Sequence, residues 1–473
     1  MSIRRHLLPY LVLVLMVAGC ADQSAKFSSD RRIEELESAS TDAANNLTTT
    51  LLEHFGTPNR LVSWSALPID YGTVSGTVLS ASGDQLRLSL ETKPPAGLAN
   101  VAVVFGENNP GPRLAVSYDS DSRMLTLAPG TKSDTLPPPG TRVRLIGHRL
   151  QQGRQSFMQH CMHCHGVAGD GFGPTARYIR NHKFNPMPRD FRRGLFKFTS
   201  TKDGIYASRD DLKRTVKLGL SGTYMPSFLL LSDAELDAVV EYVRFLAIRG
   251  ETERRLLAHF QPLIDAKTPQ DRQPLEQELN GAGFTEAFND AVSLVAENWQ
   301  AAEESDNVVL PTVARVPDGF ESRKKGRDLF IGTKINCAKC HGPRGRGNGS
   351  FLNEIQENPE TKKKYSEPGL FDNWENKVSP RDLTAGIYRG GRRPLDLFRR
   401  VTTGVKGTPM PGFAALKEED RWHIVNYILS IPIAGVFPEK KHDHPDGDDH
   451  KADKPAPAPT KSTKGSGSPS KDK

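Results

Sequence analysis

The feature that most constrains how this chain of 473 residues can fold is a short cysteine and histidine pattern that occurs twice. Residues 161–165 read CMHCH and residues 337–341 read CAKCH, so both follow C-x-x-C-H. In this pattern each thiol can form a thioether bond with a haem vinyl group, and the histidine supplies a nitrogen ligand to the iron. The sequence therefore predicts two c-type haems, one held by Cys161, Cys164 and His165 and the other by Cys337, Cys340 and His341.

Other uses of paired cysteines fit the chain less well. A zinc ribbon would place its second cysteine pair roughly 15–20 residues after the first, whereas the second pair here begins only at Cys337. Disulfides or a thioredoxin-like pair would leave the histidine after each pair unexplained. The remaining cysteine, Cys20, lies near the N-terminus and apart from both patterns.

A methionine motif follows each cysteine pattern. Residues 222–228 read GTYMPSF and residues 407–413 read GTPMPGF. A thioether held by a following proline suits iron ligation and raises the reduction potential relative to a second histidine ligand. We therefore expect Met225 and Met410 to be the sixth ligands of the two irons. The residue types leave other candidates open: a core-filling role for the methionines, His182 or Met187 at the first iron, and His423 at the second.

The two motifs belong to a longer internal repeat. Residues 211–231 align without a gap with residues 396–416, which indicates a duplicated folding unit. After the first copy, Ser232 and Glu235 form a capping-box pattern that opens a helix, and the second copy lacks this cap because Lys417 replaces the serine. Before the cysteines, each copy has a glycine and a phenylalanine one helical turn apart, which would permit a close crossing with the later helix: Gly153 and Phe157, and Gly326 and Phe330.

Together these features resemble class I cytochrome c domains. That family has a first helix with glycine and an aromatic residue, then C-x-x-C-H, a methionine loop, and a last helix with an aromatic residue. The resemblance covers residues 149–250 and 319–438, and it implies two crossing helices and a haem edge exposed for electron transfer. The second copy departs from the first by a polar insertion over residues 343–378.

Each copy also contains a Pro-Arg-Asp sequence, at residues 188–190 and 380–382. Guanidinium groups bind carboxylates through two parallel hydrogen bonds, so Arg189 and Arg381 are candidates for contact with the haem propionates. An arginine solvated on the surface is an equally good interpretation of each.

The regions outside the two copies differ in their patterning. Residues 61–148 contain about five short apolar or alternating runs between turn residues, which predicts a small barrel or sandwich. Residues 251–318 are charged and helix-prone and are expected to form a helical connector. Residues 439–473 hold almost no apolar side chains, which indicates a disordered tail. The predicted fold class is therefore multi-domain: a small β-rich domain precedes two mainly α cytochrome c domains joined by a helical connector.

The N-terminus has the pattern of an export signal. Basic residues precede an apolar run over residues 7–17, which is too short to span a bilayer as a helix. Val-Ala-Gly-Cys at residues 17–20 resembles a bacterial lipobox, which predicts a lipid on Cys20. Residues 1–19 are then a signal peptide, and residues 20–60 are a lipid tether with a polar helical segment. A plain signal peptide is the alternative. Both interpretations predict export, and the lipid would hold the protein on the periplasmic side of a bacterial membrane.

The charge argues against nucleic acid as a partner. A formal net charge of +7 spread over the whole chain is too small to attract a nucleic acid backbone. Within residues 171–217, however, twelve lysines and arginines stand against four aspartates. An exposed basic face there would steer an acidic redox partner, and scattered, solvated charges are the alternative.

These observations predict a membrane-tethered dihaem electron carrier. It would pass single electrons between a redox protein donor and acceptor, such as a respiratory complex. An enzyme such as a dihaem peroxidase would need an iron with an open site, and two complete ligand sets argue against one. A third interpretation, compatible with the first, is a haem-relay subunit that docks on a larger complex through the β-rich domain. No catalytic residues are predicted.

Overall fold

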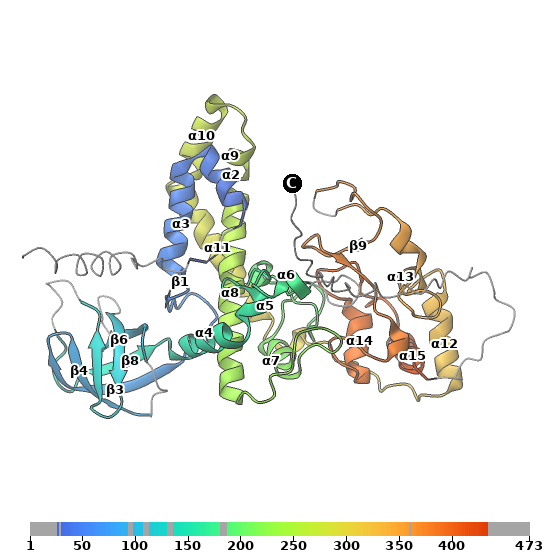
Figure 1. The fold of residues 1–473 in the computed structure, drawn as a ribbon, viewed down its shortest axis with the longest axis horizontal. Helices are drawn as coiled ribbons and strands as arrows, with labels where there is room; N and C mark the ends of the chain where they lie inside the picture. The colour runs from blue at the N-terminus through green and yellow to red at the C-terminus, as the bar shows by residue number, and fades with distance from the viewer. Residues whose placement is uncertain are drawn as a thin grey trace, which may run out of the picture. The chain divides into compact units, whose positions relative to one another are not determined.

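The computed structural model describes residues 26–27, 30–92, 98–106, 113–129, 136–179, 187–358 and 361–433 (Figure 1). The predicted signal peptide, Cys20 and the predicted tail from residue 439 lie outside the described residues. The described residues up to Pro432 group into one compact unit, to which the elements below belong. Among the described residues, no helix is both long and apolar enough to cross a membrane.

A closed barrel of six antiparallel strands forms the β-rich domain. Its strands are hydrogen-bonded in the order β3-β4-β7-β6-β5-β8. Their bounds are β3 (Thr73–Ser82), β4 (Gln85–Leu90), β5 (Val101–Phe105), β6 (Arg113–Asp119), β7 (Met124–Leu127) and β8 (Arg142–Ile146). Alternate side chains of a strand point to opposite faces, so one set fills the interior. These side chains make an apolar core that includes Val78, Leu88, Val103, Leu125 and Leu145.

The barrel settles the choice between the two β architectures that the sequence leaves open. The sequence predicts about five strands, and the structure adds β6. In this strand the pairing with β7 shifts register between Ala115 and Ser117. A register shift interrupts the alternation of inward and outward side chains, so the apolar pattern of β6 is too irregular to indicate a strand.

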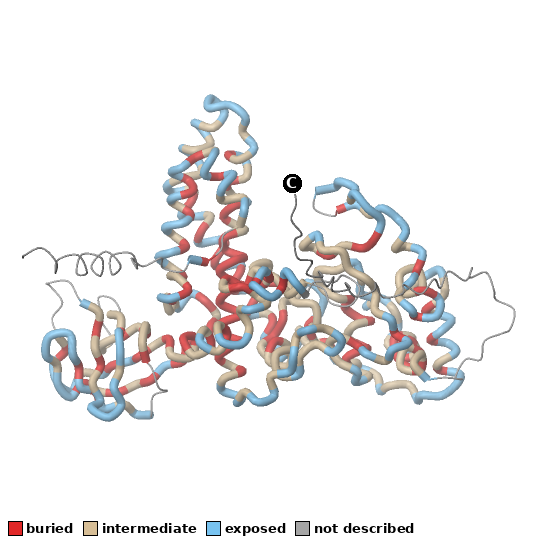
Figure 2. Tube along the Cα trace, in the orientation of Figure 1, coloured by how far each residue is buried: buried red, intermediate tan, exposed pale blue. Residues whose placement is uncertain are grey.

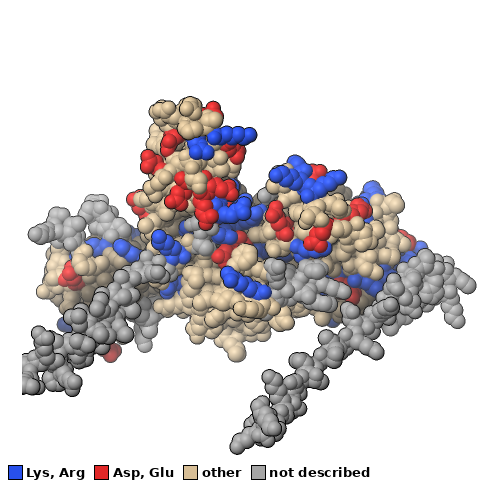
Figure 3. All heavy atoms as spheres, turned by 45° about the horizontal axis from the view of Figure 1, so that its top comes forward, with Lys and Arg blue, Asp and Glu red and all other residues tan. Residues whose placement is uncertain are grey.

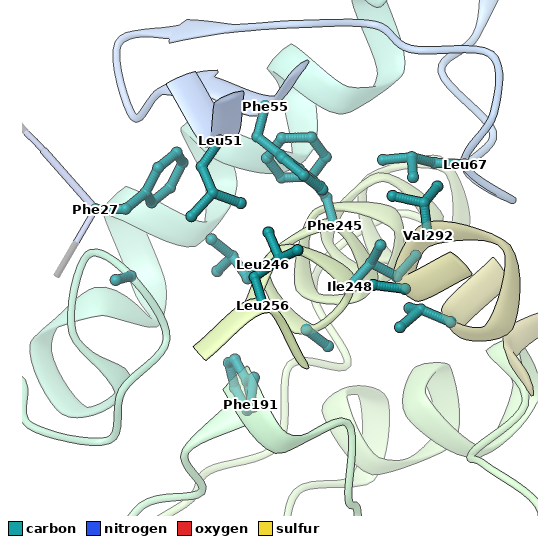
Figure 4. Close-up of a cluster of buried hydrophobic side chains, with 14 of the residues drawn as sticks. Phe27, Leu51, Phe55, Leu67, Phe191, Phe245, Leu246, Ile248, Leu256 and Val292 are labelled. Carbon is teal, nitrogen blue, oxygen red and sulfur yellow. The ribbon is translucent and has the colours of Figure 1, made fainter. Parts of the chain in front are cut away.

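The helices before the barrel pack against those that follow the first repeat copy. α2 (Arg32–Ala39) and α3 (Thr41–Phe55) share one hydrophobic core with α8 (Asp233–His259), α9 (Gln261–Asp265) and α11 (Ala282–Ala301). Figure 4 shows Phe55 and Phe245 in this cluster, and their ring centroids are 5.7 Å apart. The short strands β1 (Gly56–Thr57) and β2 (Arg60–Leu61) follow α3, and α10 (Pro269–Leu279) lies between α9 and α11.

α8 joins this helical core to the first repeat copy. It has 27 residues and begins with the predicted capping box, in which the Ser232 hydroxyl accepts a hydrogen bond from the backbone N–H of Glu235. The helix is buried along most of its length (Figure 2). The domain boundary predicted after residue 250 therefore falls inside a continuous helix, and buried side chains between Leu256 and Trp299 share a core with the first copy. The helices within residues 20–60 also pack into this core.

The two repeat copies contain corresponding helices. The first consists of α4 (His148–His160), α5 (Met162–His165), α6 (Ala176–Ile179), η1 (Phe191–Arg193), α7 (Arg209–Leu218) and α8. After η2 (Ser305–Asn307), the second consists of α12 (Phe320–Ile331), α13 (Ala338–His341), η3 (Ser350–Asn353), η4 (Leu383–Ala385), α14 (Pro394–Thr403) and α15 (Glu418–Ser430). The insertion in the second copy adds the strands β9 (Leu370–Phe371) and β10 (Lys377–Val378).

In each copy the first helix crosses the last helix at a glycine. A Cβ atom at Gly153 would overlap the carbonyl oxygen of Ala238 in α8, and one at Gly326 would overlap that of His423 in α15. An aromatic pair packs beside each crossing, with ring centroids 5.2 Å apart in Phe157–Tyr242 and 5.3 Å apart in Phe330–Tyr427. The structure thus has the close crossings that the glycine and phenylalanine spacing predicts.

Replacing Gly153 with alanine is expected to destabilise the first copy, because the new methyl group meets backbone of α8 that cannot move aside as a side chain would. The expected loss is about 1–3 kcal/mol in the free energy of unfolding, the usual cost of overpacking. Urea unfolding followed by circular dichroism measures it. Gly319→Ala is the control, since a Cβ atom there meets nothing within 4 Å. An equal change in both variants would contradict the argument.

Candidate functional site

Both predicted histidine ligands are oriented by a backbone carbonyl. Each lies at the end of a short helix that holds the second cysteine, α5 in the first copy and α13 in the second. The Nδ1 atom of His165 donates to the carbonyl of Arg189 over 3.1 Å, and Nδ1 of His341 donates to the carbonyl of Arg381 over 3.3 Å. Because a carbonyl only accepts, Nδ1 carries the proton and Nε2 keeps its lone pair for a metal.

Burial keeps both imidazoles neutral. It lowers the pKa of His165 to about 4, and it also lowers the pKa of His341. A neutral imidazole is the form that binds iron, so neither histidine has to lose a proton at neutral pH before it can act as a ligand. The ring of Phe191 is stacked on that of His165, with centroids 4.7 Å apart, and Figure 4 shows Phe191 at the edge of the apolar cluster.

A glycine-rich loop follows each histidine and turns the chain back toward the cysteines. Four glycines have the same spacing in the two copies, at 166, 169, 171 and 173 and at 342, 345, 347 and 349. The first three glycines of each set have positive φ angles, a backbone conformation that glycine adopts with less steric strain than any other residue. The fourth leaves no room for a side chain, since the Cβ atom would overlap the carbonyl of His163 or of Lys339. This repeated spacing is a further sequence signal for the site, and the predictions from the cysteine and methionine motifs did not include it.

The two methionine loops have the same hydrogen bonds. In the first, the Thr223 hydroxyl accepts from the backbone N–H of Met225 over 3.1 Å and donates to the carbonyl of Leu220 over 2.8 Å. In the second, Thr408 does the same toward Met410 and Val405, over 3.3 and 2.7 Å. Each threonine fixes the backbone of its methionine. No role for these threonines was predicted from the motif, although both copies contain them.

The first copy encloses a cavity that fits a haem. The cavity is lined by Cys161, Cys164, His165 and Met225, so both attachment thiols and both predicted axial ligands face one space. Its walls are mostly apolar, with Phe157, Leu212, Leu220, Val240 and Val243 among the lining residues. Three cations, Arg189, Lys197 and Arg389, also line it. An apolar pocket with cations matches a flat apolar macrocycle that carries two carboxylates.

The second copy presents a buried donor beside its methionine loop. A Cβ atom at Gly407 would lie 2.6 Å from the Trp374 ring, and the backbone N–H of Asn373 donates to the Gly407 carbonyl over 3.0 Å. The indole N–H of Trp374 is buried and has no hydrogen-bond partner among the residues that the structure describes. A buried unpaired donor is costly, so an acceptor such as a haem carboxylate suits this position.

The three alternative iron ligands differ in how well their positions suit that role. Met187 lines the same cavity as Met225, so it stays a candidate for the first iron. His182 lies outside the described residues. His423 lies at the crossing of α12 and α15, where its Nδ1 atom is 2.8 Å from the Ser322 hydroxyl. For the zinc alternative, no group of three or more histidine, cysteine or acidic residues suited to a metal ion occurs in the described part of the chain.

The two predicted propionate arginines lie where the repeat copies meet. Arg189 lines the cavity of the first copy, and its guanidinium carbon lies 3.6 Å from the centroid of the Trp374 ring. The Nε atom of Arg381 donates to the carbonyl of Ile387 over 3.0 Å. A Cβ atom at Gly222, in the methionine loop of the other copy, would overlap the Arg381 guanidinium. Contact of either arginine with a propionate stays a prediction.

Six of the ten described cations in residues 171–217 are paired with acidic side chains, which reduces the predicted basic face. Two of the twelve, Arg180 and Lys183, lie outside the described residues. Six others form ion pairs with Asp or Glu: Arg192, Lys197, Arg209, Lys213, Arg214 and Lys217. On the face drawn in Figure 3, basic and acidic side chains are interspersed. The alternative of scattered charges therefore describes these residues better.

Comparison with known proteins agrees with the geometry. The cytochrome c family model matches residues 150–247 and 324–432. No curated protein matches the chain. Among solved structures, a chain of the reducing HAO-like protein complex of Kuenenia stuttgartiensis is similar at 23% identity and a TM-score of 0.40. That likeness covers 59% of this chain and 96% of the other, and it is too distant to carry an inference about function.

The family matches fall on the two repeat copies, each with its C-x-x-C-H sequence, oriented histidine and methionine loop. The predicted fold class is confirmed, with a six-stranded barrel as its β-rich domain. Residues 150–247 and 324–432 are therefore two cytochrome c domains in tandem, which hold two covalently bound c-type haems.

Proposed function

We propose that this dihaem cytochrome is an electron carrier with histidine and methionine ligands at both irons, held by a lipid on the periplasmic side of a bacterial membrane. The observation that carries the proposal is the duplicated methionine loop. In both domains a threonine hydroxyl holds the backbone of the methionine through the same two hydrogen bonds. A rigid thioether in both domains suits reversible electron transfer and leaves neither iron open for a substrate.

The protein's own part in this function is to hold and tune the cofactor. A bound haem supplies an iron that changes its charge by one electron. The four cysteines keep the haems attached in both oxidation states. The carbonyls of Arg189 and Arg381 orient the proximal imidazoles and make them better ligands. The apolar lining of the first cavity disfavours the more highly charged oxidised state, which raises the reduction potential.

A peroxidase is the competing enzyme function, and a haem-relay subunit is a competing role in electron transfer. A peroxidase needs an iron with an open or displaceable sixth site, whereas the same methionine loop in both domains supports a filled site at each. The relay subunit differs from the carrier only in a permanent partner. For the carrier we propose a redox protein donor and acceptor in a respiratory chain, without nucleic acid. Purification in mild detergent, followed by mass measurement of the intact particle, separates carrier from relay.

Met225→Ala is expected to open the iron of the first domain alone. The wild-type reduced protein should bind carbon monoxide poorly, whereas the variant should bind it at one haem and show a lower potential there. Met410→Ala should have the same effect at the other haem. Optical titration with carbon monoxide measures both. Met187→Ala is the matched control, because Met187 lines the same cavity and should leave binding unchanged.

Two outcomes would contradict the proposed ligation. If Met187→Ala opens the first haem and Met225→Ala does not, then the sixth ligand is Met187. If the wild-type protein binds carbon monoxide rapidly at one haem and turns over peroxide, then the protein is an enzyme of the peroxidase type and not a carrier.

Cys20→Ser is expected to release the protein from the membrane fraction. Diacylglycerol and a second acyl group on Cys20 would hold the protein firmly, whereas a free N-terminus after signal cleavage would not. Fractionation of broken cells, with haem staining of each fraction, measures the release. A wild-type protein that is already in the soluble exported fraction would show that there is no lipid anchor.

A further inference from the structure

The haem cavity of the first cytochrome c domain is completed by a residue of the second. Arg389 follows η4 in the second domain, yet it lines the cavity that contains Cys161, Cys164 and His165. The backbone beside it lies directly against the cavity wall, since a Cβ atom at Gly390 would lie 2.7 Å from the ring of Phe198. Phe198 is itself a lining residue.

Arg389 also reaches the methionine loop of the first domain. Its Nη2 atom donates to the carbonyl of Gly222 over 3.4 Å, three residues before Met225. The guanidinium of Arg381 adjoins the same glycine, where any Cβ atom would overlap it. Two arginines of the second domain therefore lie against the loop that presents the predicted sixth ligand of the first.

The charged residues around this cavity are mostly positive. Among the residues that line it, Arg189, Lys197 and Arg389 are cations, and the carboxylate is that of Asp211. Both oxygens of Asp211 already accept from the backbone N–H of Ser200, over 2.8 Å each. Lys197 lies 3.4 Å from Asp372, a residue of the second domain. Arg189, Lys197 and Arg389 are each partly buried. An anion inside the apolar cavity would compensate cations in this position.

We propose that Arg389 of the second domain binds a propionate of the haem in the first domain, so that the second domain completes the first haem site. The inference deepens the proposed function and rests on it. A guanidinium can form two parallel hydrogen bonds with a carboxylate. Such a pair would explain why an arginine of the second domain lies at the cavity of the first. The charge of Arg389 then acts on the iron of the neighbouring domain.

Contacts on either side hold Arg389 in place. Arg214 of the first domain forms two hydrogen bonds with Asp396 of the second, over 2.7 and 2.8 Å. Arg400 donates to the carbonyls of Lys197 and Thr199 in the first domain, the first of these over 2.9 Å. These contacts are independent of Arg389, so its replacement is not expected to separate the domains.

The test is a redox titration of the full-length holoprotein with the substitution Arg389→Gln. The titration uses a Cys161→Ser background. There the haem of the first domain keeps one unsaturated vinyl group, which moves its absorption bands to longer wavelength and distinguishes the two haems. Loss of a nearby positive charge makes the oxidised iron easier to form, so the potential of the first haem should fall while that of the second stays unchanged. Resonance Raman spectra should show a shifted propionate bending band at the same haem.

Arg392→Gln is the matched control, because Arg392 is an exposed arginine in the same segment and does not line the cavity. It should leave both potentials unchanged, and Arg389→Lys, which keeps the charge, should restore most of the lost potential. If Cys161→Ser does not mature, Cys337→Ser labels the other haem for the same comparison. Equal shifts at both haems, an equal shift in the control, or no shift would overturn the proposal. A wild-type protein without haem staining would instead refute the proposed function.

Discussion

The close contact between the first and last helix of each cytochrome c domain is the constraint on which both sites depend. Gly153 and Gly326 bring backbone against backbone, where one added carbon atom would overlap a carbonyl oxygen. The cysteines follow the first helix of each pair and the methionine loop precedes the last. The crossing therefore fixes the distance between the two sides of the cavity. The glycine-rich loops and threonine hydrogen bonds then adjust the local backbone within that frame.

What the sequence could predict is local or duplicated. The attachment sites, the histidines, the crossings and five of the barrel strands each leave a short pattern. β6 does not, because its register shift breaks the alternation. The continuity of α8 across residue 250 was also missed, because an apolar stripe shows that a face is buried and not what buries it. The charges of residues 171–217 suggested an exposed face, yet Arg214 and Lys197 pair with acids far away in the sequence.

Hydrogen bonds at the junction between the two domains explain part of the difference between the predicted basic face and the paired charges that the structure shows. These hydrogen bonds join cations to backbone carbonyls as well as to carboxylates. Arg193 donates to the carbonyl of Asn373 over 2.5 Å, and Lys406 donates to the carbonyl of Ile205. A count of charged residues does not include the carbonyl groups that accept hydrogen bonds from cations. Composition alone therefore overstates how much positive charge is exposed. The insertion of the second domain contributes Asn373 and Trp374 to this junction, which makes it a structural part of the pair of domains.

α8 also determines how separable the parts of this protein are. The same helix crosses α4 in the first cytochrome c domain and then continues as a central element of the helical core with α3 and α11. A first domain excised at residue 250 would lack the last part of α8. Leu256 and Leu257, which lie in that part, would no longer join the first domain to the shared core. The second domain ends instead in α15, which packs on α12 and α14 of its own repeat. The two copies of the repeat are therefore unequal: the last helix of the second packs within its own copy, whereas the last helix of the first continues into the surrounding helical core.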